Sequence, residues 1–201
     1  MGAWNTAIVN PKWLAREILG LPEGSPFKMD LAIGSSTNVR ALLSELFFMP
    51  TNDTFLINPS KENNSLFSLA DKAATKLYST LPHTPIIAIG YNFSYELEGN
   101  ETFNFKPDFN LSRLERTYND IKGKALSNST IKHSLSLDNY QHLNLNLSFH
   151  SLEEKLFLLM NYHYQADNNK TVINEALGKF HEFYEHSKLI SSKLITTEVK
   201  H

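Results

Sequence analysis

The sequence predicts an α+β fold in which long helices pack on one face of antiparallel sheet. Three observations indicate this class: apolar and polar residues alternate along several short segments, amphipathic helices with recognisable ends lie between them, and the order of these elements repeats. With 201 residues, 41% of them hydrophobic, the chain can bury its own core. We expect a single domain, 1–201, built from two similar β-α-β-β-β-α halves at about 1–83 and 84–201.

The first half is expected to begin with a strand at Thr6–Val9, followed by a helix with clear boundaries. Asn10 is a favourable N-cap, Pro11 suits the first helical position, and Gly20 follows the last apolar residues as a stop signal. The segment Phe27–Ile33 then carries apolar side chains at every second position. This period of two is typical of a strand with one buried face.

Two further strands and a helix complete the first half. The helix is predicted from about Asn64 to Thr80, and it ends before Pro82, which cannot continue it. Its apolar residues recur at helical spacing and define one inward face. They are Leu66, Leu69, Ala70, Ala73 and Leu77.

The second half repeats this order with longer strands. The segments Ile86–Leu97, Ile131–Leu137 and Leu143–Phe149 all alternate. A weak helix is expected at Leu111–Lys122, and the longest helix at about Val172–Leu194. The inward residues of that last helix would be Ile173, Leu177, Phe180, Tyr184 and either Leu189 or Ile190.

A shift of 101 residues supports an internal duplication. It carries the apolar positions Leu46, Phe48, Phe55 and Ile57 onto Leu147, Phe149, Leu156 and Leu158. The match concerns hydrophobic pattern rather than residue identity, so chance similarity between two antiparallel hairpins stays open as an alternative. The repeated order is similar to the TATA-binding-protein-like, or helix-grip, repeats, in which a curved sheet presents one face to a long helix. This topological resemblance implies a fold and no function.

A sequence resemblance spans most of the chain. Four pieces carry it: Pro85–Phe93 after an amphipathic helix, Leu156–Tyr164, Phe180–Glu182 and Leu194–Thr196. The first piece resembles a strand of a sporadically distributed family of uncharacterised bacterial proteins. The second resembles the last strand of that family, and the other two resemble its closing helix. Because the shared positions are packing positions, the resemblance assigns no catalytic residue.

Composition and charge exclude several classes of function. Without cysteine, the chain has no disulfide, no thiol nucleophile and no thiolate metal ligand. The net charge is −2, and neither half has the excess of Lys and Arg that neutralises a phosphate backbone. No apolar run approaches the ~20 residues of a membrane span, and the N-terminal segment does not resemble a secretory signal. We therefore expect a cytoplasmic protein and disfavour nucleic acid and membrane as partners.

The sequence contains no motif for catalysis or metal binding. His181 and His186 flank two glutamates on the last helix, but the histidines lie five residues apart, about 140° around a helix, whereas a zinc-hydrolase motif needs a spacing of four. The strand histidines divide between two faces, because His150 has the parity of neighbouring asparagines and His133 has the parity of Leu135. Nucleophile elbows, phosphate-binding loops and dinucleotide fingerprints are absent. We expect no catalytic residue, no metal and no cofactor.

Two surfaces are candidate binding sites. One is the polar face of the second-half sheet, whose amides, hydroxyls and imidazole could hydrogen-bond a ligand or a strand; a solvated outer face is the alternative. Its residues are Asn92, Ser94, Asn144, Asn146, Ser148 and His150. The other is the connection Gly99–Asn110, which carries Phe103, Phe105 and Phe109. These rings either pack into the core or form an apolar edge for a partner.

The favoured hypothesis is a non-catalytic protein-interaction or assembly module in a bacterial cytoplasm. It would bind a protein partner, or form a homo-oligomer, through an exposed strand edge or through the Phe103–Phe109 segment. The motivation is the lack of catalytic motifs combined with well-patterned strands. The alternative is a small-ligand-binding protein or an enzyme that uses a cavity between the C-terminal helix and the sheet.

Overall fold

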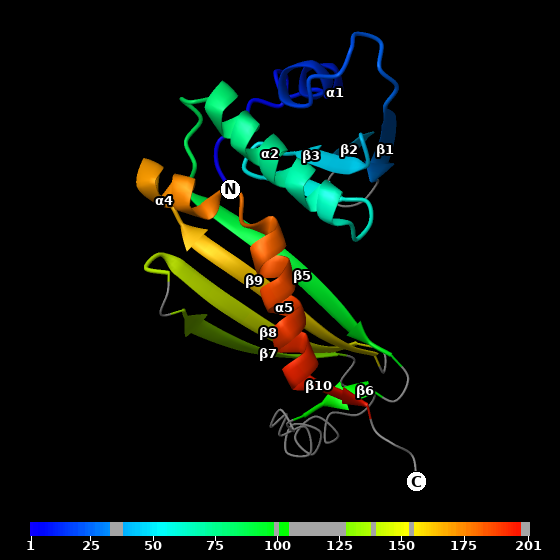
Figure 1. The fold of residues 1–201 in the computed structure, drawn as a ribbon, viewed down its shortest axis with the longest axis vertical. Helices are drawn as coiled ribbons and strands as arrows, with labels where there is room; N and C mark the ends of the chain where they lie inside the picture. Colours follow the sequence, from blue (N-terminus) through cyan, green and yellow to red (C-terminus); the bar gives the residue numbers. More distant parts are fainter. Residues whose placement is uncertain (33–37, 99–100, 105–127, 138–139, 153–154, 198–201) are drawn as a thin grey trace, which may run out of the picture. The chain divides into compact units, whose positions relative to one another are not determined.

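The computed structural model describes residues 1–32, 38–98, 101–104, 128–137, 140–152 and 155–197. Helices and antiparallel sheets are both present, which confirms the α+β class. The chain divides into two compact units, Met1–Gly90 with Tyr164–Glu182, and Tyr91–His163 with Phe183–His201. Each unit therefore combines segments that are distant in the sequence (Figure 1).

The first unit contains a four-stranded antiparallel meander in the order β1-β2-β3-β4. β2 and β3 are joined by Ser44 and Glu45, whose φ angles of 47° and 64° lie in the left-handed region. A two-residue hairpin needs this conformation, because it matches the twist of the flanking strands. The strands are β1 Lys28–Ala32, β2 Asn38–Leu43, β3 Leu46–Pro50 and β4 Phe55–Pro59.

The first helical segment has the ends that the sequence predicts. The Asn10 side chain accepts a hydrogen bond from the Trp13 backbone N–H at 3.0 Å. α1, Pro11–Trp13, continues directly as a π-helical segment, η1, Leu14–Ile18. Gly20 follows with a φ of 63°, a conformation that glycine adopts without steric cost.

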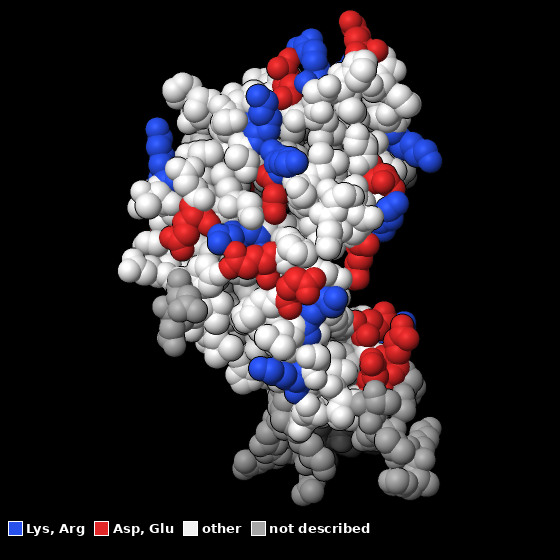
Figure 2. Space-filling model, viewed as in Figure 1, with Lys and Arg blue, Asp and Glu red and all other residues white. Residues whose placement is uncertain are grey.

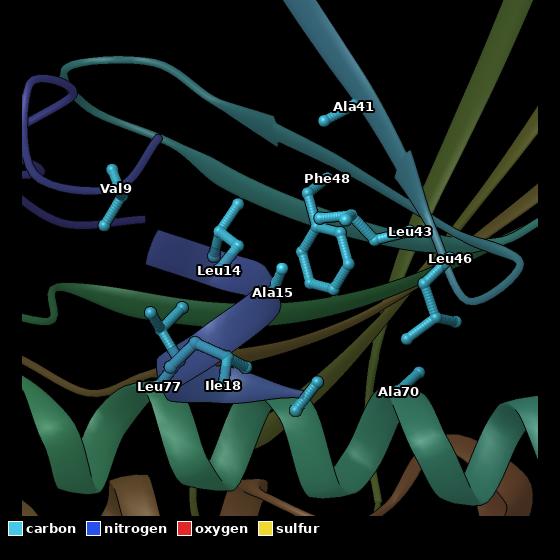
Figure 3. Close-up of a cluster of buried hydrophobic side chains, with 11 residues drawn as sticks. Val9, Leu14, Ala15, Ile18, Ala41, Leu43, Leu46, Phe48, Ala70 and Leu77 are labelled. Carbon is cyan, nitrogen blue, oxygen red and sulfur yellow. The ribbon is translucent and has the colours of Figure 1, made fainter. Parts of the chain in front are cut away.

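α2, Asn64–Thr80, has the predicted bounds, and Asn63 caps it by accepting the Ser65 N–H at 2.8 Å. Its apolar face packs with η1 and with the inward side chains of the meander. Figure 3 shows this core, which consists of Val9, Leu14, Ala15, Ile18, Ala41, Leu43, Leu46, Phe48, Ala70, Ala73 and Leu77. Burying one large apolar side chain of this kind stabilises a fold by about 1.5–3 kcal/mol.

The predicted strand at Thr6–Val9 is wrong. These residues form a turn, in which the Ile8 and Val9 N–H groups donate to the Asn5 carbonyl at 3.0 and 3.2 Å. Backbone groups that are satisfied locally need no neighbouring strand. Val9 is nevertheless buried in the core, which accounts for its apolar character.

The prediction of one continuous helix at Val172–Leu194 is wrong. The segment contains two helices, α4, Lys170–Ala176, and α5, Phe180–Leu194. Between them Leu177 has an extended ψ of 148° and Gly178 has a φ of 77°, so the backbone leaves the helical path. Glycine permits this break, because a positive φ is costly for residues with a Cβ.

Most of the second sheet lies in the second unit, with the order β5-β9-β8-β7. Neighbouring strands run in opposite directions (Figure 1). The strands are β5 Ala88–Leu97, β9 Lys155–Gln165, β8 Leu143–Leu152 and β7 Asn128–Ser136. β6, Glu101–Phe103, and β10, Ile195–Thr197, form a separate two-stranded ribbon.

Helix α5 covers one face of this sheet (Figure 1). The Phe183 ring stacks on Tyr162 of β9 with centroids 4.5 Å apart and contacts Tyr91 of β5 at 5.3 Å. Phe183 and Tyr162 are 1% and 0% exposed. This aromatic contact anchors the helix on the sheet.

The inward face of α5 differs from the prediction. Its buried residues are Phe183, Ser187 and Ser191, at helical spacing, whereas Tyr184 is half-buried and Leu189 is 52% exposed. Because α5 begins anew at Phe180, the residues of α4 do not determine which side of α5 faces the sheet. Small serines let the helix approach the large side chains that the strands supply.

The predicted alternation of the second sheet is confirmed in β8 and only partly in β5, and the burial of β7 does not follow it, because His133 and Leu135 on its predicted inward side are exposed. Every second residue of β8 is buried, namely Leu143, Leu145, Leu147 and Phe149. In β5, Tyr91 and Leu97 are buried as expected, but the preceding Ile87 is 50% exposed and Ala88 is buried. The buried side changes near Gly90, where the chain passes from the first unit to the second. Ala88 is therefore buried within the first unit, and Tyr91 and Leu97 within the second.

The internal duplication is not confirmed. The shift of 101 residues does carry the hairpin β3–β4 onto the hairpin β8–β9. However, the first half lacks the opening strand, and its sheet joins consecutive strands, whereas the second sheet places β9 beside β5. An alternating hairpin is common to many folds, so chance similarity between two hairpins stays open as the alternative.

Asp71 of α2 caps the start of α5. Its carboxylate oxygens accept the Phe180 backbone N–H at 3.1 and 3.2 Å. Partial burial raises the pKa of this carboxyl above its ordinary value of 3.8, although the hydrogen bonds act in the opposite direction. The folded protein therefore holds the Asp71 proton more tightly than the unfolded chain does.

We expect the free energy of unfolding of the wild type, relative to Asp71→Asn, to fall as the pH rises above 3.8. A carboxyl with a raised pKa contributes stability that is present below the unfolded pKa and is lost as the pH rises through the folded pKa. Urea unfolding at a series of pH values measures this difference. Asp53→Asn is the control, and its difference in unfolding free energy from the wild type should change with pH in the opposite direction. A hydrogen bond from Thr51 Oγ1 at 2.7 Å lowers the pKa of Asp53. A relative stability that rises with pH at Asp71 would contradict the assignment.

Candidate functional site

The second sheet has two chemically distinct faces. The face toward α5 holds buried aromatic and aliphatic side chains, including Tyr91 and Tyr162. The opposite face carries short polar side chains from all four strands. Asn92, Ser94 and Asn144 on this face are exposed. This open polar face contains the first candidate surface.

A row of hydrogen-bonded side chains crosses the polar face from strand to strand. Ser134 Oγ of β7 donates to Asn146 Oδ1 of β8 at 2.8 Å. Asn146 Nδ2 donates to Asn161 Oδ1 of β9 at 3.1 Å. Asn161 Nδ2 in turn donates to Asn92 Oδ1 of β5 at 2.8 Å. We call these four residues the amide ladder.

The amide ladder is ordered without being saturated. A primary amide has two N–H donors and an oxygen that accepts two bonds. The bonds within the ladder use one donor each of Asn146 and Asn161. Hydrogen-bonding capacity is thus left for water or a partner. Because the side chains are already held in place, binding at this row costs less conformational entropy.

The other predicted residues of this face surround the ladder. His150 Nδ1 of β8 and Thr130 Oγ1 of β7 lie 2.9 Å apart in a hydrogen bond. Asn144 and Ser94 are exposed, and Ser148 is half-buried. Of the six predicted residues, the ladder contains two, and the strand alternation places the remaining four on the same face.

An exposed aliphatic side chain lies on this face as well. Leu159 of β9 shares the parity of Asn161 and is 37% exposed. The described charged residues of the face are Lys132 of β7 and the pair of Glu96 with Lys155, whose atoms lie 2.6 Å apart. The face is therefore close to neutral, with uncharged hydrogen-bonding groups beside the apolar side chains of Leu159 and the half-buried Phe157.

Charge is mixed on the side of the molecule that carries α5. Figure 2 shows Lys and Arg side chains scattered among Asp and Glu in this view, and the positive charges do not gather into an extended patch. A surface that binds a phosphate backbone concentrates positive charge. The arrangement visible in this view offers no such surface.

In the part of the chain that the structure describes, no helix has both the length and the apolar character needed to cross a membrane.

The second candidate surface is only partly described. Phe103, in β6, is 7% exposed and packs edge-on against Phe149 of β8, with ring centroids 5.1 Å apart. Phe103 therefore belongs to the core, which is one of the two alternatives that the sequence left open. Phe105 and Phe109 lie outside the described residues.

Side chains fill the contact between α5 and the sheet. Beyond the stacked Phe183 and Tyr162, the hydroxyls of Tyr95 and Ser187 lie 2.7 Å apart. The Tyr162 hydroxyl lies 3.0 Å from His186 Nδ1. Burial raises the pKa of Tyr162 well above its usual range, so its hydroxyl stays protonated and can donate to the imidazole. These contacts are those of a packed helix–sheet interface.

The two histidines of the last helix have separate surroundings. His181 lies beside the Phe67 ring, with centroids 6.3 Å apart, while His186 is bonded to Tyr162. Nowhere in the described ranges do three His, Asp or Glu side chains converge in a way that could hold a metal ion.

Sequence reasoning missed Asn161, the central residue of the amide ladder. A signal was present, because Asn161 alternates with the buried Met160 and Tyr162 and so belongs on the opposite face. Its two hydrogen-bond partners, however, depend on β9 lying between β5 and β8. That strand order is a property of the folded sheet.

Comparison of the chain with protein families, with curated proteins and with solved structures finds no significant match. The function is therefore inferred from the geometry of the chain itself.

We expect Asn161→Ala to lower the free energy of unfolding by about 1 kcal/mol, because the hydrogen bonds to Asn146 and Asn92 are both lost at a partly solvated site. Urea denaturation measures the change. Asn144→Ala, on the same face but outside the ladder, is the matched control and should cost less than about 0.5 kcal/mol. Equal effects of the two substitutions would show that the ladder is not a connected network.

Proposed function

We propose that this protein is a non-catalytic interaction module that binds a protein partner through the open polar face of the β5-β9-β8-β7 sheet. The observation that carries the proposal is the amide ladder, which holds one side chain from each of four strands through hydrogen bonds of 2.8, 3.1 and 2.8 Å. Polar groups already fixed on a rigid sheet are suited to recognition, because little side-chain freedom is lost on binding.

Leu159 supports the same proposal. Protein interfaces combine apolar contacts with hydrogen bonds, at about one hydrogen bond per 100–200 Å². Leu159 lies on β9, the strand that also contributes the centre of the ladder, and more than a third of it is exposed. A partner that covers this leucine would also reach the amides of Asn161 and Asn146.

The chemistry of the face favours a protein over nucleic acid or carbohydrate. Lys132 and the ion-paired Lys155 provide too little positive charge to neutralise a phosphate backbone. Phe157 of β9, which shares the parity of Leu159 and is half-buried, is the one Phe, Tyr or Trp at the described positions of this face, whereas strand-binding sheets present several rings on which successive bases stack. A cytoplasmic location is part of the proposal, and the absence of cysteine is consistent with it.

A ligand cavity between α5 and the sheet is the weaker alternative. The stacked rings of Phe183 and Tyr162 and the fully buried Ser187 occupy the middle of that contact. A ligand there would have to displace aromatic side chains that anchor the helix.

The test is capture of partners by tagged protein from a lysate of the source cells. We expect a protein that co-purifies with the wild type to be lost with Leu159→Arg, because a guanidinium on the face would be buried without a partner. Leu56→Arg is the matched control, since Leu56 of β4 is 39% exposed, close to Leu159, but belongs to the other sheet. Retention of every captured protein by the Leu159→Arg variant would contradict this use of the face.

A further inference from the structure

The outer edge of β7 is a second surface of the same sheet. β7 is the last strand in the described order, and β8 pairs with one of its sides over nine residue pairs. In an antiparallel strand every second residue turns its N–H and C=O groups away from the neighbour. Thr130 and residues 132–136 are exposed. This edge can therefore hydrogen-bond a further strand.

The edge has little of the protection that natural edge strands use. Its sequence, from Asn128 to Ser136, contains neither proline nor glycine, and its register with β8 runs without a bulge. Lys132 is the single Lys, Arg, Asp or Glu of the strand. On the other face of the strand Leu135 is 45% exposed. An edge of this kind is favourable for pairing with a strand of matching pattern.

Two-fold symmetry restricts how β7 can pair with a second copy of itself. With the axis perpendicular to the sheet, the residue on the axis faces itself, and residues equally distant on either side face each other. An axis at Lys132 would oppose two ammonium groups, which is unfavourable. An axis at His133 places the two His133 side chains opposite each other and sets no Lys, Arg, Asp or Glu against a like charge. The cross-strand pairs are then Ile131 with Leu135, Thr130 with Ser136, and Lys132 with Ser134.

The aliphatic residues distinguish this register from the next. With the axis at Ile131, the two copies of β7 pair over the same number of residues as with the axis at His133. Leu135 then has no residue of β7 opposite it. With the axis at His133, the exposed Leu135 of each copy lies against Ile131 of the other, and this pair forms twice. Ile131 and Leu135 lie on the face toward Phe149 and Leu145 of β8, so the apolar row continues across the junction.

We propose that two copies of this chain associate through β7, antiparallel, with the two-fold axis at His133. This inference rests on the proposed function, which it deepens by naming a partner: the polar faces of the two copies would join into one surface across eight strands. The amide ladder of each copy ends at Ser134 of β7, beside the junction. The dimer thus doubles the length of the proposed contact surface.

The experiment places charge on the axis. His133→Glu and His133→Lys each oppose like charges in the dimer, whereas a 1:1 mixture of the two variants opposes Glu to Lys. We expect sedimentation velocity to show a dimer for the wild type, a dissociation constant raised at least about tenfold for each variant alone, and recovery of the dimer in the mixture. Native mass spectrometry of the mixture should show mainly the mixed species.

The matched control is Ser94→Glu, which adds a charge at an exposed position of β5, the strand at the other end of the described order from β7. It should dimerise as the wild type does, and circular dichroism verifies that each variant is folded. A wild type that stays monomeric up to about 100 µM, a dimer that neither His133 variant weakens, or a mixture that does not recover overturns the proposal. Partner capture through Leu159 has its own readout, so failure of the dimer and failure of the proposed function are distinguishable.

Discussion

The packing of α5 on β9 is the contact on which the second unit depends. The stacked rings of Phe183 and Tyr162 determine which side of β9 faces inward. Because side chains of a strand alternate between faces, an inward Tyr162 requires an outward Asn161. The buried aromatic contact and the amide ladder on the opposite face therefore both depend on which side of β9 faces α5.

The proposed association rests on two features of the second sheet, its polar face and the β7 edge. Three amides and the Ser134 hydroxyl are linked by hydrogen bonds across four strands, and β7 carries a pattern that matches itself about His133. Neither feature needs a cofactor or a perturbed nucleophile. Among the described residues, α5 covers one face of this sheet, and the polar side chains lie on the other.

Local signals predicted the elements whose ends are encoded nearby. The bounds of α2 follow from its own cap at Asn63 and from Pro82, and the burial of β8 follows from its alternation. Prediction failed where the burial of a residue depends on segments far away in the sequence, and where one backbone angle ends a helix. Gly178 interrupts a continuous helical pattern, and Ile87 is exposed because the buried side of its segment changes near Gly90. No pattern of neighbouring residues encodes either event strongly.

The sequence by itself determined the α+β class, the inward and outward sides of β8, and the polar character of the candidate face, because these depend on the spacing of residues within one element. Only the tertiary structure decided that β9 lies between β5 and β8, which makes Asn161 the link between Asn92 and Asn146. It also decided that β7 is the last strand of this sheet among the described residues. Strand order and pairing depend on contacts between residues far apart in the chain, and hydrophobic periodicity carries no information about which strands become neighbours.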